Sequence, residues 1–229
     1  MTRREKIRQM TLDEINTLSL EIIAEQGIEG LTIHGIARRM GMTAPAFYRY
    51  YKNRDALIKS LILSAYASFV AALESSVERR SRSATAVQRL QGLFTAYRAW
   101  AVAHPNLFVL FAGKKVQGFE EQDPEILSAA ERVNRIFLDT FHGAWPGEGK
   151  IRAELPAPVR KHIEQRLRAE SSPIPLAVVQ AALESACLVH GMISMELSGR
   201  LEEMVGDPAA YYNGHVLALL GRFGISQED

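Results

Sequence analysis

The segment TIHGIARRMGMTAPAFYRYYKNRDALIK, residues 32–59, decides the fold of this chain. Thr32 is a helix cap, and apolar residues at helical spacing follow it as one face of a short helix: Ile33, Ile36, Ala37 and Met40. Gly41 fits the left-handed position where a helix ends. Thr43 offers a second cap, with Pro45 in the first turn behind it. The segment therefore predicts two short helices joined by a glycine turn, the helix-turn-helix arrangement.

The second of these helices carries the candidate functional face. Phe47 and either Tyr50 or Tyr51 are spaced to face inward, which leaves four residues outward: Ala44, Tyr48, Arg49 and Lys52. A phenol, a guanidinium and an ammonium all donate to phosphate oxygens, so this face fits a nucleic-acid backbone. Asn53 then caps a longer helix. An ordinary helical hairpin with a solvated basic face is the alternative.

Residues 11–59 strongly resemble the DNA-binding domain of TetR/AcrR-family bacterial transcriptional regulators. The matching segments are IAEQGIEGLTIHGIARRMGMT and APAFYRYYKNRDALI. The resemblance implies an all-α protein with a three-helix DNA-binding domain in residues 1–55. Residues 56–229 would then form a helical ligand-binding and dimerisation domain. One departure is Gly35 inside a helix, which costs about 1 kcal/mol relative to alanine unless the backbone approaches something closely there.

The resemblance also implies a set of DNA-facing residues: Thr32, Thr43, Ala44, Pro45, Tyr48, Arg49 and Lys52. We favour Ala44 and Pro45 near base edges, and Tyr48 and Lys52 on the backbone. A guanidinium is able to read guanine, but as a phosphate contact Arg49 would carry no sequence information. A symmetric dimer would read a pseudo-palindromic double-stranded DNA operator.

Composition and charge agree with a globular intracellular regulator. The 229 residues are 47% apolar and carry a net charge of +1, but residues 1–60 hold ten Lys/Arg against seven Asp/Glu. The basic N-terminus lacks the apolar core of a signal peptide, and no uninterrupted apolar run reaches the roughly 18 residues of a membrane span. Cys187 is the only cysteine, so we expect a reducing, cytoplasmic location and no membrane partner.

The rest of the chain reads as helices without strands. Residues 1–10 form a charged arm that either reaches along DNA or frays in solvent, and Thr11 and Glu14 form a capping box for the first helix. A long helix over residues 54–80 would link the two domains. A further helix is expected after the break at residues 81–85 and up to His104-Pro105, and others over residues 107–112, 124–141, 159–167, 176–197 and 209–223.

The last two helices, about residues 176–198 and 209–223, predict the homodimer interface. The first is rich in small side chains that allow close helix approach: Ala177, Ala181, Ala182, Ser185, Ala186, Gly191 and Ser194. The second carries Tyr212, Val216, Leu219, Leu220 and Phe223 on one side. A four-helix interface with a second copy would bury this surface.

The C-terminal half shows a second resemblance, to a TetR subgroup named for a Trp-His-Gly motif. It rests on AWAVAHPNLFVLFAG (99–113) and ACLVHGMISMELSGRL (186–201). Val189 stands where the motif has tryptophan, while His190 and Gly191 carry over.

Aromatic residues and two histidines mark a candidate pocket in the second domain: Tyr66, Phe69, Trp100, His104, Phe108, Phe111, Phe137, Phe141 and His190. A cavity lined by them would suit a small apolar or aromatic effector. The alternative is that these rings fill the core.

Other chemistry has little support in the sequence. Glu184, Cys187 and His190 follow one another at steps of three, which puts potential metal ligands on one side of a helix, but a structural set fits the spacing better. There is no phosphate-binding glycine loop, nucleophile elbow or carboxylate pair, so we expect no cofactor, no metal and no catalytic residue.

The sequence thus predicts a ligand-released repressor that binds DNA as a dimer. Transcriptional activation instead of repression is an alternative that the sequence leaves open. So are a helical small-molecule-binding or enzyme domain and a non-specific DNA-binding protein.

Overall fold

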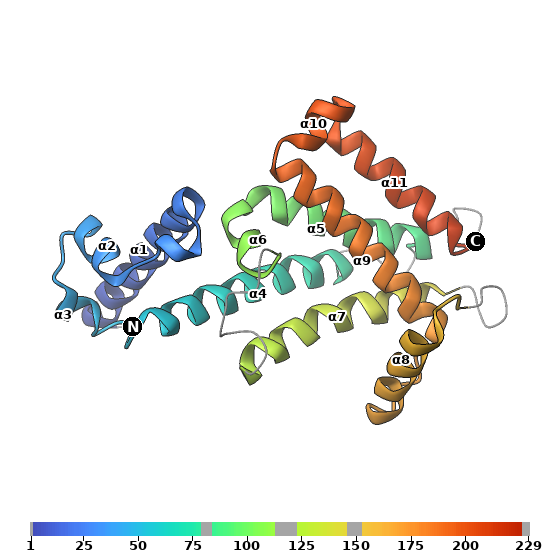
Figure 1. The fold of residues 1–229 in the computed structure, drawn as a ribbon, viewed down its shortest axis with the longest axis horizontal. Helices are drawn as coiled ribbons and strands as arrows, with labels where there is room; N and C mark the ends of the chain where they lie inside the picture. Colours follow the sequence, from blue (N-terminus) through green and yellow to red (C-terminus); the bar gives the residue numbers. More distant parts are fainter. Residues whose placement is uncertain (1, 79–83, 113–122, 146–152, 226–229) are drawn as a thin grey trace. The chain divides into compact units, whose positions relative to one another are not determined.

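A computed structural model describes residues 2–78, 84–112, 123–145 and 153–225 of the chain (Figure 1). These residues form eleven α-helices and one 3₁₀ helix, and they contain no strand. The all-α prediction is confirmed. The helices are α1 (Arg3–Gln26), η1 (Ile28–Gly30), α2 (Ile33–Arg39), α3 (Ala44–Phe47), α4 (Arg54–Glu78), α5 (Ala86–Ala103), α6 (Pro105–Ala112), α7 (Pro124–Ala144), α8 (Ala157–Ala169), α9 (Leu176–Leu197), α10 (Arg200–Val205) and α11 (Pro208–Arg222).

Packing divides the chain into two units. The N-terminal unit comprises Met1–Ser68 and His104–Ala130, and the C-terminal unit comprises Phe69–Ala103 and Glu131–Asp229. Helices α4 and α7 each continue from one unit into the other. The division therefore differs from a single cut after residue 55, because α6 and the start of α7 pack with the N-terminal helices. A functional boundary at residue 55 stays a prediction.

The core of the N-terminal unit joins the first four helices to α6 and α7. Its buried residues are Ile15, Ile22, Ile23, Leu31, Ile36, Ala37, Phe47, Tyr51, Leu57, Ile58, Leu61, Ile62, Ala65, Leu110 and Ile126. Ile15, Ile22 and Ile23 of α1 lie in this core with Ile36 and Phe47. Leu110 and Ile126 come from α6 and α7, which the sequence analysis placed in the second domain. Burial of this apolar set holds the helix-turn-helix together.

Helix α1 begins earlier than predicted. Thr2 is its N-cap: the Thr2 hydroxyl accepts from the Glu5 amide at 3.3 Å, and the Glu5 carboxylate accepts from the Thr2 amide at 2.7 Å. Thr11 is interior, and its hydroxyl donates to the Ile7 carbonyl at 3.0 Å. The capping box at Thr11 and Glu14 was therefore wrong. The same T-x-x-E pattern occurs at residues 2–5, and good helix formers between the two sites carry the helix through.

The C-terminal unit packs α5 against α9 and α11 around aromatic rings. Phe94 lies 5.9 Å from Phe137 and 6.0 Å from Phe141, measured between ring centroids. The buried Tyr212 hydroxyl donates to the Phe94 carbonyl at 2.8 Å, which ties α11 to α5. Burial raises the pKa of the Tyr212 phenol, so it remains a neutral donor.

Two polar contacts hold α9 on α5. The Arg98 guanidinium forms a two-pronged ion pair with Glu196, with Nε donating to Oε2 at 2.8 Å. The Tyr97 hydroxyl lies 2.9 Å from His190 Nδ1. His190, which the sequence analysis aligned with the histidine of a Trp-His-Gly motif, thus joins two helices of one unit. Helix α10, between α9 and α11, was not predicted; it begins after the left-handed Gly199.

Helices α4 and α9 are long and apolar enough, by length and composition, to cross a membrane. Polar and charged residues such as Lys59 and Glu184 interrupt both helices, so neither forms the uninterrupted apolar run expected of a membrane span. Of the most apolar stretch, 44% is buried inside the protein in α4 and 39% in α9. Each helix also contributes buried residues to a helical core, such as Ile58 and Leu61 of α4 and Val178 and Ile193 of α9.

Candidate DNA interface and ligand site

The two caps of the helix-turn-helix form as predicted. Thr32 Oγ1 accepts from the Gly35 amide at 3.1 Å, and Thr43 Oγ1 accepts from the Ala46 amide at 3.4 Å. Gly41 has φ +64°, the left-handed conformation expected at the end of α2. Asn53 Oδ1 likewise accepts from the Ala56 amide at 2.8 Å at the start of α4.

Gly35 has a local explanation. A Cβ built at this position would lie 2.8 Å from Thr32 Oγ1, the oxygen that caps α2. Glycine therefore leaves room for the cap, which offsets its poor helix propensity. The sequence identified the departure but not the atom that explains it.

Helix α3 is shorter than the predicted recognition helix. It covers Ala44–Phe47, after which the Arg49 and Tyr50 amides bond to carbonyls three residues back, at 3.3 and 2.8 Å. This tightened turn carries Tyr48 and Arg49, and Lys52 lies in the bend that follows. The candidate face is thus a short helix, a turn and a bend.

Nearly all of the predicted DNA-facing residues lie at the surface. Thr32, Thr43, Pro45, Tyr48, Arg49 and Lys52 are exposed, and Ala44 is half-buried. Phe47 is fully buried, and of the two alternative tyrosines Tyr51 is the more deeply placed. The Tyr51 hydroxyl donates to Asn16 Oδ1 at 2.9 Å, which ties the segment after α3 to α1. Phe47 and Tyr51 therefore anchor the segment in the core, while the side that bears Tyr48, Arg49 and Lys52 faces solvent.

Several cations of the N-terminal unit are held by the protein itself. Arg54 Nε donates to the Leu31 carbonyl at 2.6 Å, and Arg54 Nη2 donates to the Ile28 carbonyl, so Arg54 fixes the start of α4 to the end of η1. Arg39 pairs with Glu25 at 2.6 Å. The hydrogen bond from Arg39 lowers the pKa of the Glu25 carboxyl. Sequence counting cannot separate these cations from those available to DNA.

Arg8 lies beside the candidate face. Its Nη1 donates to the Arg49 carbonyl at 3.3 Å, and its guanidinium carbon lies 5.5 Å from the centroid of the Tyr50 ring. The first turns of α1 therefore contact the end of the turn that follows α3. Residues 3–10 of the predicted arm are helical, and Arg8 makes this contact.

The predicted pocket residues fall in two groups. Tyr66, His104, Phe108 and Phe111 belong to the N-terminal unit, and Phe69, Trp100, Phe137, Phe141 and His190 belong to the C-terminal unit. Phe69 packs on Trp100 at 4.8 Å between centroids, and both are buried. Phe108, Phe137 and Phe141 are buried, Tyr66 and His190 half-buried, and His104 exposed. The Phe111 side chain lies outside the described part of the structure.

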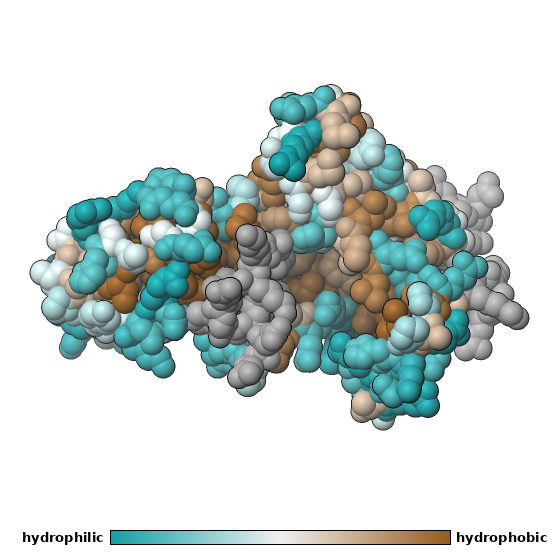
Figure 2. All heavy atoms as spheres, in the orientation of Figure 1, coloured by the Kyte–Doolittle hydropathy of each residue, from teal (hydrophilic) through white to brown (hydrophobic). Residues whose placement is uncertain are grey.

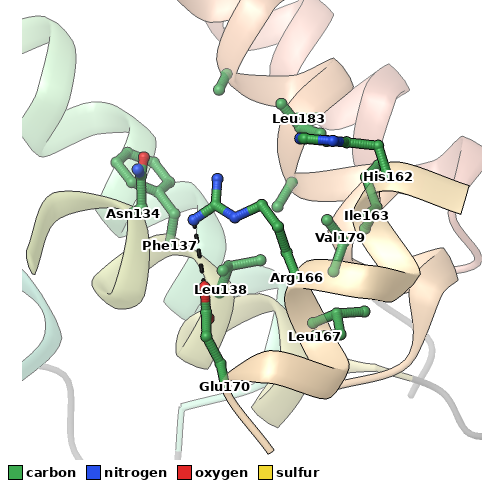
Figure 3. Close-up of a pocket in the computed structure, with 12 residues that line it drawn as sticks. Asn134, Phe137, Leu138, His162, Ile163, Arg166, Leu167, Glu170, Val179 and Leu183 are labelled. Carbon is green, nitrogen blue, oxygen red and sulfur yellow. Dashed lines mark hydrogen bonds and ion pairs between the residues drawn. The ribbon is translucent and has the colours of Figure 1, made fainter. Parts of the chain in front are cut away.

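A cavity of about 320 Å³ lies in the C-terminal unit between α7, α8 and α9 (Figure 3). It is lined by Asn134, Phe137, Leu138, His162, Ile163, Arg166, Leu167, Glu170, Val179, Ala182, Leu183 and Ala186. Phe137 alone was in the predicted pocket set. Arg166 and Glu170 pair with each other at 3.3 Å at one side of it. The sequence missed this site because its apolar lining comes from three helices whose pairing is a tertiary property.

The series Glu184, Cys187 and His190 does not converge on one point. Glu184 accepts from Gln180 at 2.8 Å and pairs with Arg222 at 3.6 Å, while Cys187 is exposed. Among the described residues, no group of three or more His, Cys, Asp or Glu is arranged to hold a metal ion.

Comparison with known proteins covers nearly the whole chain. Residues 17–61 match the sequence model of the bacterial regulatory proteins of the tetR family. Residues 90–219 match that of the tetracyclin repressor-like C-terminal domain.

Individual relatives agree with these matches. The HTH-type transcriptional regulator Rv1816 of Mycobacterium tuberculosis is 26% identical over 95% of this chain and 94% of its own length. The class C tetracycline repressor protein of Escherichia coli is 42% identical over 43 residues, which are 19% of this chain and 20% of that protein. A crystal structure described as that of a regulatory protein, SCO4313, is 30% identical, with a TM-score of 0.76 over 96% of this chain and 100% of that one.

Proposed function

This chain belongs to the TetR family of bacterial regulatory proteins, and we propose that it is a repressor that binds a pseudo-palindromic operator as a homodimer and leaves it when a small molecule binds. The observation that carries this proposal is the doubly capped helix-turn-helix, whose Thr43–Lys52 side is exposed while Phe47 anchors it from behind. The family is one of transcriptional regulators and not of enzymes, and we assign the protein no catalytic role. We place its action in the cytoplasm.

Each residue of the exposed face has a role in this proposal. Ala44 and Pro45 are small and begin α3, so the backbone is able to approach base edges there. Tyr48 and Lys52 anchor the DNA backbone through a hydroxyl and an ammonium, and Arg49 adds a phosphate contact. Thr32 and Thr43, the two cap residues, lie at the helix starts nearest the phosphates.

The dimer forms through α9 and α11. The side of α11 that the sequence analysis assigned to this interface is buried within the protomer, so that choice of residues was wrong: Tyr212, Val216, Leu219, Leu220 and Phe223. The small residues Ala181, Ala182 and Ser185 of α9 are buried in the same way. Both helices leave other apolar side chains exposed: Leu183, Leu188 and Met195 on α9, and Tyr211 and Leu217 on α11. A Cβ added at Gly191, Gly214 or Gly221 would meet no other atom within 4 Å, so a second helix has room to approach closely. Figure 2 shows apolar surface along α9. Its burial against a second copy would supply the driving force.

The effector binds in the C-terminal unit. The cavity between α7, α8 and α9 has an apolar floor and suits a small apolar or aromatic molecule. The neighbouring predicted pocket residues of this unit, Phe69, Trp100, Phe141 and His190, extend the same aromatic core. Binding shifts the population of conformers through α4 and α7, the helices shared by both units, and lowers DNA affinity.

A gel-shift assay with the intergenic DNA upstream of the gene tests the proposal. The wild-type protein should give a symmetric, salt-sensitive footprint, because phosphate contacts release counterions. Tyr48→Ala combined with Lys52→Ala should fold normally and lose binding. Lys161→Ala, which removes an exposed ammonium from α8, is the control and should bind as the wild type does.

Two outcomes would contradict the assignment. Retained affinity in the Tyr48 and Lys52 double variant would show that the exposed face does not contact DNA. Equal affinity for scrambled DNA would favour a non-specific DNA-binding protein instead of a repressor.

A further inference from the structure

The first two turns of α1 carry an exposed cationic surface that the helix-turn-helix does not account for. Arg3, Arg4, Lys6 and Arg8 are all exposed, and the one acid among them, Glu5, is engaged in the capping box with Thr2. Residues 2–10 contribute no buried side chain, so these turns are not needed for the core. A helix this polar gains little from burial of apolar surface.

Arg8 fixes where this surface lies. Its guanidinium donates to the Arg49 carbonyl and covers the Tyr50 ring, at the end of the turn that carries Tyr48 and Arg49. This contact belongs wholly to the N-terminal unit. The face of α1 that bears Arg8 therefore adjoins the face proposed to contact DNA.

Helical periodicity then separates the remaining cations. Arg4 precedes Arg8 by four residues, so the two share one face about 6 Å apart along the axis. Lys6 precedes Arg8 by two residues, which turns it about 200° away, to the opposite side of the helix. Arg4 thus lies on the face of α1 that bears Arg8 and contacts the turn after α3, whereas Lys6 lies on the opposite face.

We propose that the start of α1 is a second DNA-backbone contact, in which Arg8 positions the turn after α3 and Arg4 binds a phosphate that flanks the base-reading segment. The proposal rests on the proposed DNA-binding function. Its ligand class is the phosphodiester backbone of duplex DNA, to which guanidinium groups donate two hydrogen bonds at once. The contact would add affinity without reading sequence.

The test compares two charge-matched variants of the full chain, Arg4→Gln and Lys6→Gln. Affinity for the operator fragment is measured by fluorescence anisotropy between 50 and 200 mM salt. Each lost phosphate contact lowers the salt slope by about 0.9. With one contact per protomer, the wild type should lose about tenfold more affinity over this range than Arg4→Gln does. Lys6→Gln should keep the wild-type slope, and thermal melts check that both variants fold.

Several outcomes overturn the proposal. Equal salt slopes for the wild type and Arg4→Gln would show that Arg4 makes no phosphate contact. Equal reductions of the slope in Arg4→Gln and Lys6→Gln would show a general effect of positive charge instead of a specific contact by Arg4. A wild-type protein that binds no operator would instead refute the proposed function. An Arg4→Gln deficit that persists on an operator trimmed to its central base-read pairs would also contradict a flanking phosphate.

Arg8 is tested as a positioning residue. Arg8→Ala should lower the ratio of operator to scrambled-DNA affinity, because the turn bearing Tyr48 loses its support. Arg8→Lys should restore part of that ratio, since an ammonium is also able to donate to the Arg49 carbonyl. A ratio unchanged in Arg8→Ala would count against the positioning role.

Discussion

Single residues in the helix-turn-helix are explained by contacts a few atoms away. Thr32, Thr43 and Asn53 each cap the helix that follows, and Gly41 ends α2 in the left-handed conformation. These choices depend on the backbone within about four residues, so sequence spacing predicts them well. Gly35 is also explained locally, because a Cβ at this position would clash with the Thr32 hydroxyl that caps α2.

We predict that Gly35→Ala leaves stability nearly unchanged. Alanine gains about 1 kcal/mol of helix propensity, and the displaced Thr32 cap loses about 1 kcal/mol. In a Thr32→Ala background the cap is already lost, so Gly35→Ala should then stabilise by about 1 kcal/mol. Urea unfolding of the four proteins in this cycle measures the difference. Equal effects of Gly35→Ala in both backgrounds would show that the cap and the glycine are independent.

At the scale of elements, packing assigns α6 and the first part of α7, up to Ala130, to the N-terminal unit. Ile126 is buried in the same core as Leu57 and Ile58 of α4. Lys59 pairs with Asp123 at 2.8 Å and with Glu125 at 2.6 Å. The hydrogen bond from Lys59 lowers the pKa of the Asp123 carboxyl. Its stabilisation is therefore present above the ordinary pKa of an aspartate and is lost as pH falls through the lowered value. The ion pairs of Lys59 with Asp123 and Glu125 should therefore form at neutral pH.

We predict that Ile126→Ala destabilises the N-terminal unit by about 2–5 kcal/mol, as removal of a buried isoleucine side chain does. The neighbouring Leu127→Ala, at an exposed position, should change stability by less than about 0.5 kcal/mol. Hydrogen exchange locates the effect: amides of α1 and α4 should lose protection first. Loss of protection confined to α9 and α11 would place Ile126 in the other unit.

For the whole molecule, the proposed function depends on a second copy, which we propose covers α9 and α11. The exposed apolar residues on these helices, and the open space at Gly191, Gly214 and Gly221, support this interface. Two recognition segments held at a fixed separation would explain a symmetric operator.

We predict that Leu217→Glu gives a monomer with strongly reduced operator affinity, because the new carboxylate would be buried against its symmetry mate. Met204→Glu is the control: Met204 is 71% exposed on α10, and the same change there should leave the dimer intact. Sedimentation and anisotropy measure both proteins. A dimeric Leu217→Glu protein would exclude α11 as the interface, and a monomeric variant with full affinity would separate dimerisation from DNA binding.

The sequence by itself determined most of the helices, the caps at Thr32, Thr43 and Asn53 and the helix-turn-helix, since hydrogen bonds within about four residues and φ preferences set these. It did not predict α10 or the early end of α3. It did not set the start of α1, because two capping boxes with the same pattern compete there. Only the tertiary structure decided which cationic side chains bind other groups of the protein, as Arg54 and Arg39 do, and which remain exposed beside α3. It also decided that α6 packs with the N-terminal helices and that a cavity lies between α7, α8 and α9. The physical reason is distance along the chain: these partners are separated by many residues, and no local pattern encodes which of them meet.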